Sequence, residues 1–292
     1  MRRDLRIWLI ILVIMGCFAA NSVMTRYLVL VREVSPFLVT ALRFISGLAV
    51  LLILPSLQPV TFRHDKLNRS YLPGAFFLST YAFSISYGYV FISVAAGTFI
   101  FYTFVVVTMA TYSVVQDREP LTLRLLLGVI SGLVGVLIIT FGRISSVTLP
   151  GVILMAVTGT SWGLYSAYGK RFKITFSYTY NSFLILGAFA IIASTALALS
   201  GQILFTSISI RDFGLALYMG TVSTALSYVL WNATVKQITA SLGGLVQLIV
   251  PVLAPAMGII FLGEQLTAPL ILGGGMVMLA IYTVGSNPRA KS

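Results

Sequence analysis

Apolar runs of about 20 residues, separated by short polar breaks, fill almost the whole chain. Hydrophobic residues make up 58% of the 292 residues, charged residues only 9%, and the mean hydropathy is +1.00. Soluble domains carry about a quarter charged residues. A run of about 20 apolar residues crosses the hydrocarbon core of a bilayer as one helix, with every backbone hydrogen bond made internally. The sequence therefore predicts an all-α integral membrane protein.

Ten runs are long enough to be transmembrane helices. Proline marks several of the breaks between them, at Pro36, Pro120 and Pro150, because it starts or stops helices. The first run is too long for the core of a signal peptide, so we expect a retained first span. The expected spans lie near residues 7–28, 36–55, 72–91, 96–116, 121–141, 150–169, 178–199, 213–232, 241–262 and 266–285.

Lys and Arg gather at alternate breaks. The N-terminal segment, the breaks after the second, fourth, sixth and eighth spans, and the C-terminal segment hold fourteen of the nineteen basic residues. Four lie on the other side, and Arg43 lies inside a span. The positive-inside rule then predicts that both termini are cytoplasmic. The net charge of +12 reports this topology, and no nucleic-acid partner is expected.

The chain repeats itself at half its length. The segment Glu119-Pro120-Leu121-Thr122 recurs 145 residues later as Glu264-Gln265-Leu266-Thr267, and Gly128 matches Gly273 at the same spacing. We expect two five-helix domains, residues 1–144 and 145–292. Because five is odd, the second domain enters the membrane from the opposite side, so the repeat is inverted. Inverted repeats are a common framework for alternating access to a central solute site.

These motifs resemble the drug/metabolite transporter superfamily, in its ten-helix branch with two EamA-type repeats. The resemblance rests on Gly16-Cys17-Phe18-Ala19-Ala20-Asn21 and its counterpart Thr160-Ser161-Trp162-Gly163, on Pro36 with Arg43-Phe44, and on the repeated Glu-x-Leu-Thr segment. Among members, the chain looks most like the exporters of aromatic and other hydrophobic amino acids. The resemblance implies a multi-pass transporter of the cell membrane, which in bacteria is the inner membrane.

Aromatic, hydroxyl and amide side chains form stripes at helical spacing inside several spans. Aromatic walls could pack against an apolar solute while hydroxyls and amides hold its polar end. The same side chains could instead serve helix packing, and amides could serve as hydrogen-bonding links between helices, so both interpretations stay open. The candidate substrate-binding residues are Phe18, Asn21, Phe77, Tyr81, Ser84, Thr98, Tyr102, Trp162, Tyr165, Ser227, Tyr228, Ser241 and Gln247.

Charged residues are almost absent from the spans. Arg43 is the exception, about 10 Å from the expected outer boundary by helix rise. It could bind a substrate carboxylate, or it could snorkel and pair with helix-end carbonyls; we favour the structural interpretation. Glu119 and Glu264, at helix starts, are interpreted as structural partners of the helix dipole.

The inventory of reactive residues is small. All seven acids lie at span ends or in loops, His64 is the only histidine and lies in a loop, and Cys17 is the only cysteine. We therefore expect no catalytic residue, no metal site and no cofactor. A proton-coupled exporter of cationic drugs would need a buried acid, and a carrier of sugar phosphates would need several buried cations. The sequence therefore argues against both.

A small-molecule substrate and the lipid bilayer are the expected partners, with the oligomeric state open. The sequence thus favours export of aromatic or hydrophobic amino acids, or similar neutral amphipathic metabolites. The alternatives are an exporter of lipophilic drugs or other neutral metabolites, and a scaffold or sensor subunit that transports nothing.

Overall fold

The structure is a computed structural model that describes residues 2–141, 147–200, 209–253 and 267–286. Regular structure in these ranges is helical apart from one isolated bridge between Ile92 and Val147. The first helices are α1 (Arg2–Arg26), its π-helical extension η1 (Tyr27–Val31), α2 (Pro36–Leu57), the short 3-10 helix η2 (Arg69–Tyr71), α3 (Leu72–Phe91), α4 (Val94–Val115) and α5 (Leu123–Thr140). Then follow α6 (Leu149–Gly169), α7 (Thr175–Leu199), α8 (Ile210–Tyr218), the π-helix η4 (Met219–Leu226), α9 (Ser227–Val235), α10 (Ala240–Val246), the 3-10 helix η5 (Gln247–Ile249) and α12 (Ala268–Gly285).

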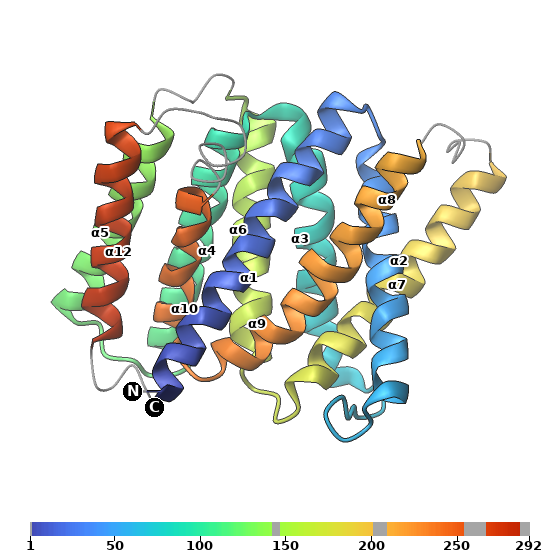
Figure 1. Cartoon of the computed structure of the whole chain (residues 1–292), viewed down its shortest axis with the longest axis horizontal. Helices are drawn as coiled ribbons and strands as arrows, with labels where there is room; N and C mark the ends of the chain where they lie inside the picture. The colour runs from blue at the N-terminus through green and yellow to red at the C-terminus, as the bar shows by residue number, and fades with distance from the viewer. Residues whose placement is uncertain (1, 142–146, 201–208, 254–266, 287–292) are drawn as a thin grey trace.

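The long helices stand side by side in one bundle (Figure 1). α5 and α12 pack against each other at one edge, α7 lies at the opposite edge against α2, and α6 contacts both α3 and α4. The start of α1 and the end of α12 lie at the same end of the bundle, which we call the termini end. The other end is the far end.

Seven helical segments are long and apolar enough to cross a membrane, which confirms a multi-pass helical membrane protein. α3 and α6 are as long, at 20 and 21 residues, but their Ser, Thr, Tyr and Gly residues make them less apolar. The expected span 241–262 runs beyond the described residues, and its described part is the shorter helix Ala240–Leu253. The count of ten spans therefore stays a prediction. The seven segments are Arg6–Val31, Pro36–Leu57, Ala96–Val115, Leu123–Thr140, Thr175–Leu199, Ile210–Val235 and Ala268–Gly285.

Two helices change their winding in mid-course, which the sequence analysis did not predict. The π-helix η4 lies against α2, where a Cβ atom on Gly220 would collide with Ser46 Oγ and the Arg43 carbonyl. The 3-10 segment η5 has a local cause in the sequence. Pro251 has no N–H to donate to the carbonyl of Gln247 four residues earlier, and that carbonyl accepts from the Val250 N–H instead.

The repeated Glu-x-Leu-Thr segment forms the entry to α5. Thr122 is the N-cap, and its hydroxyl accepts a hydrogen bond from the Leu125 N–H at 3.1 Å. Glu119 precedes Thr122 in the turn between α4 and α5, and its carboxylate accepts a hydrogen bond from the Ser113 hydroxyl at 2.5 Å. Glu119 therefore fastens the α4–α5 turn, and Thr122 occupies the capping position. Glu264, its expected counterpart, lies outside the described residues.

Candidate functional site

A small cavity lies among α1, α3, α4, α6 and α9. Its volume is about 10 Å³, room for roughly one water molecule. Sequence reasoning missed two of the lining residues, although Ser22 follows Phe18 by four positions and Phe101 follows Thr98 by three, so each shares a helical face with a predicted residue. The lining residues are Phe18, Asn21, Ser22, Tyr81, Phe101, Tyr102, Trp162 and Tyr228.

Trp162 is the centre of an aromatic cluster that fills most of this space. Its ring stands edge-on to Phe18 at 5.4 Å between centroids, and it lies 4.9 Å from Tyr81 and 4.7 Å from Tyr228. Edge-on and tilted contacts of this kind are favourable because the positive ring edge meets the negative face. The four rings come from α1, α3, α6 and α9, so the cluster joins helices that are far apart in the sequence.

A hydrogen bond orients the Trp162 ring. Its Nε1 donates to Gln247 Oε1 at 2.6 Å, and Gln247 Nε2 donates to the Gly243 carbonyl at 3.0 Å and to Met109 Sδ at 3.3 Å. Gln247 is fully buried and does not line the cavity. Its amide therefore positions an aromatic wall from behind.

Arg43 is fully buried beside the cluster. Its Nε donates to Thr224 Oγ1 at 2.9 Å, and its Nη2 donates to the hydroxyls of Tyr81 at 3.1 Å and Tyr228 at 2.9 Å. The two tyrosine hydroxyls are also hydrogen-bonded to each other at 3.1 Å. These partners are hydroxyls of η4, α3 and α9 rather than the expected helix-end carbonyls.

Six other predicted residues are not among those that line the cavity. Ser84 accepts from Thr158 at 2.8 Å, Tyr165 accepts from Asn232 Nδ2 at 3.2 Å, and Ser227 donates to the Ser223 carbonyl at 2.7 Å. Thr98 and Ser241 are buried. Phe77 is only half-buried and packs on Phe76 and Tyr168. The hydroxyls of Ser84, Tyr165 and Ser227 are thus bonded to neighbouring groups, whereas the buried Ser241 hydroxyl has no partner among the described residues.

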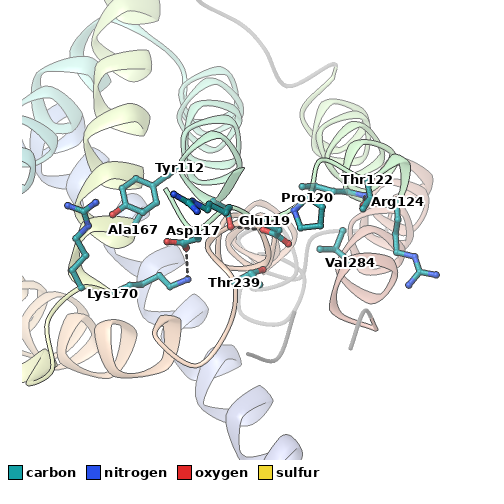
Figure 2. Close-up of a pocket in the computed structure, with 14 residues that line it drawn as sticks. Tyr112, Asp117, Glu119, Pro120, Thr122, Arg124, Ala167, Lys170, Thr239 and Val284 are labelled. Atoms are coloured by element: carbon teal, nitrogen blue, oxygen red, sulfur yellow. Dashed lines mark hydrogen bonds and ion pairs between the residues drawn. The ribbon is translucent and has the colours of Figure 1, made fainter. Parts of the chain in front are cut away.

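A larger pocket opens at the termini end, where α4 and α6 end and α5 and α10 begin (Figure 2). Its volume is about 710 Å³. Charged side chains surround it, and Lys170 pairs with Asp117 at 3.1 Å. Sequence reasoning used these basic residues only as a signal of topology, so it did not predict that they line a pocket.

The fold, the cavity and the pocket together indicate what class of protein this is. A bundle of apolar helices with a buried aromatic cavity and a separate charged pocket at one end has features that small-molecule sites of membrane proteins share. The sequence profile of the EamA-like transporter family matches residues 6–141 and 149–286, and the chain belongs to this family. It is therefore a multi-pass membrane transporter within the drug/metabolite transporter superfamily.

Several known proteins are similar to this chain. An uncharacterized Pseudomonas aeruginosa protein is 32% identical over 283 residues, covering 95% of this chain and 96% of its own length. An uncharacterized transporter of Archaeoglobus fulgidus is 25% identical, with 87% and 90% covered, and one of Bacillus subtilis is 24% identical, with 86% and 88% covered. A crystal structure with a TM-score of 0.72 and 18% identity covers 92% of this chain and 94% of its own. That likeness concerns the fold.

Proposed function

We propose that this transporter exports aromatic or hydrophobic amino acids, or similar amphipathic metabolites, through the aromatic cavity. The observation that carries the proposal is the cluster around Trp162, whose rings come from four helices and leave about 10 Å³ between them. Aromatic faces pack well against an apolar side chain. A solute would enter as the rings turn or the helices separate.

The route through the protein follows from the same geometry. The pocket of about 710 Å³ at the termini end supports an entrance there, and the cavity among the rings supports a closed central site. In the proposed cycle, the domains 1–144 and 145–292 act as inverted five-helix repeats, and each side opens in turn. With both termini in the cytoplasm, the charged pocket faces the cell interior, and the protein lies in the bacterial inner membrane.

Transport in proteoliposomes tests the proposal directly. Purified protein should accelerate uptake and counterflow of radiolabelled phenylalanine, leucine or methionine over protein-free vesicles. Leu279→Ala should transport as well as the unmodified protein, because Leu279 is 59% exposed on α12 and is not among the residues that line the cavity. If no amino acid crosses faster than in empty vesicles, the substrate assignment fails. Transport of lipophilic drugs alone would support the alternative exporter.

A further inference from the structure

Arg43 carries a buried positive charge that no carboxylate balances within the part of the chain that the structure describes. The ion pairs found there are Arg32 with Asp212 and Lys170 with Asp117. Arg43 is bonded only to hydroxyl oxygens, although it is fully buried. Burying an ion without a counter-charge is costly, and charged residues kept inside membrane helices are commonly functional. The environment of Arg43 is therefore short of negative charge.

The same cluster has more hydrogen-bond donors than acceptors. Arg43 Nη1 is buried and has no partner among the described residues. The hydroxyls of Tyr81 and Tyr228 both accept from Arg43 Nη2 and bond to each other. Whichever tyrosine donates in that last bond, the other keeps a proton for which the described residues provide no acceptor. The cluster therefore lacks an acceptor group.

The two tyrosines of this cluster lie at the wall of the cavity. Tyr81 and Tyr228 both line it, and Arg43 lies directly behind them. The guanidinium is also held over the rings of Phe44 and Tyr81, at 4.9 and 5.5 Å from their centroids. An acidic group that entered the cavity would meet two hydroxyls backed by a fixed cation. Hydrogen bonds to ionised groups are stronger than those between neutral groups.

We propose that Arg43, Tyr81 and Tyr228 form a carboxylate subsite, so that the substrate is an amphipathic monocarboxylate, a class that includes zwitterionic amino acids. This inference rests on the proposed function and narrows it. A single cation matches a single negative charge, and the surrounding rings match an apolar side chain. Asn21, on the same cavity, has a buried amide oxygen without a partner, which is suited to accept from an ammonium group.

Matched acid and amide probes test the subsite by thermal stabilisation of the purified protein and by competition with transport. The pairs are phenylalanine with phenylalaninamide and 3-phenylpropanoate with 3-phenylpropanamide, which keep the apolar part constant. We expect each acid to bind at least about tenfold more tightly than its amide, the size of one hydrogen bond to a charged group. Amides that bind and are carried as well as the acids would overturn the subsite while leaving the transport proposal intact. If no acid binds, the subsite is also overturned.

Variants assign the preference to these residues. Arg43→Gln should abolish the preference for the acid, and Arg211→Gln, which removes the same charge from an exposed position, should keep it. Because Arg43→Gln could fail to fold, Tyr81→Phe and Tyr228→Phe provide a milder test with the cation in place. Each should weaken binding of the acid by about tenfold and leave binding of the amide nearly unchanged. Equal weakening of both probes would assign the hydroxyls to packing and overturn the proposal.

Discussion

The α5–α12 pair and the α3–α6 pair are both close helix contacts, but the first is formed by backbone atoms of glycines and the second by side chains. α5 and α12 meet through glycines: a Cβ atom on Gly135 would lie 2.6 Å from the Gly273 carbonyl oxygen. At mid-height, α3 and α6 meet through side chains, with Thr158 donating to Ser84 at 2.8 Å and the rings of Tyr81 and Trp162 4.9 Å apart. Backbone in contact with backbone cannot adjust by rotamer changes, whereas rings and hydroxyls can. The comparison teaches that the α5–α12 contact has less room to adjust than the α3–α6 contact at the level of Tyr81 and Trp162.

The largest expected effect comes from disrupting the α5–α12 contact. Gly135→Ala forces a methyl group against the backbone of α12, so we expect it to lower the free energy of unfolding by about 1–3 kcal/mol, measured by thermal unfolding in detergent. Gly275→Ala is the matched control in α12, because a Cβ atom there meets nothing within 4 Å. It should be neutral or slightly stabilising, since alanine favours helix over glycine by about 1 kcal/mol. Equal effects of the two changes would refute backbone contact as the basis of the pair.

A change at the centre should lower transport as well as stability. Trp162→Phe keeps a ring in the cluster but removes the donor to Gln247. We expect transport to fall by about tenfold and the free energy of unfolding by about 1–2 kcal/mol, the range for a lost buried hydrogen bond. The readouts are uptake in proteoliposomes and thermal unfolding of the same preparation. Trp8→Phe, at a 39% exposed tryptophan, is the control and should change neither. Unchanged transport by Trp162→Phe would place the centre in the same structural class as the edge.

The smallest expected effect concerns the N-terminal caps of the two edge helices, α5 and α12. The Thr122 hydroxyl caps α5, whereas Thr267, at the same point of the repeated segment, makes no capping hydrogen bond. Thr122→Ala should therefore cost about 1 kcal/mol of stability, and Thr267→Ala should cost little. Chemical denaturation of the two variants measures the difference. A larger loss for Thr267→Ala would show that the caps do not follow this arrangement.

The sequence predicted individual helices better than it predicted which helices pack against each other. Pro36 marked the start of α2 correctly, since it is the first residue of that helix, and the aromatic spacing predicted faces that do turn inward. The partners of Arg43 could not be predicted, because Thr224 and Tyr228 lie 181 and 185 residues away in the sequence. Helical periodicity says which residues share a face, but it carries no information on which faces meet.

The same limit explains why some of the predicted site residues do not line the cavity. Ser84 and Tyr165 were chosen for their faces, yet their hydroxyls are engaged by Thr158 and Asn232. Neighbouring helices had already satisfied these polar groups, as buried polar groups require. The winding changes at η4 and η5 were missed for another reason. A local pattern search assumes regular turns, and only Pro251 gave a signal that could have found one of them.

The π-helix η4 makes one stretch of the chain unusually tolerant of a change in its length. Residues 219–226 turn more widely than an α-helix, and such segments contain an extra residue in the winding. Because the wide turn absorbs that residue, deleting one residue there would restore regular α-helical winding and keep the residues that follow, Tyr228 among them, on nearly the same face. A deletion of one residue inside α9 has no wide turn to absorb it and would rotate everything after it by about 100°, the turn of one α-helical residue. For this protein, the loss of a single codon should therefore be far less harmful in η4 than in the regular helix that follows it.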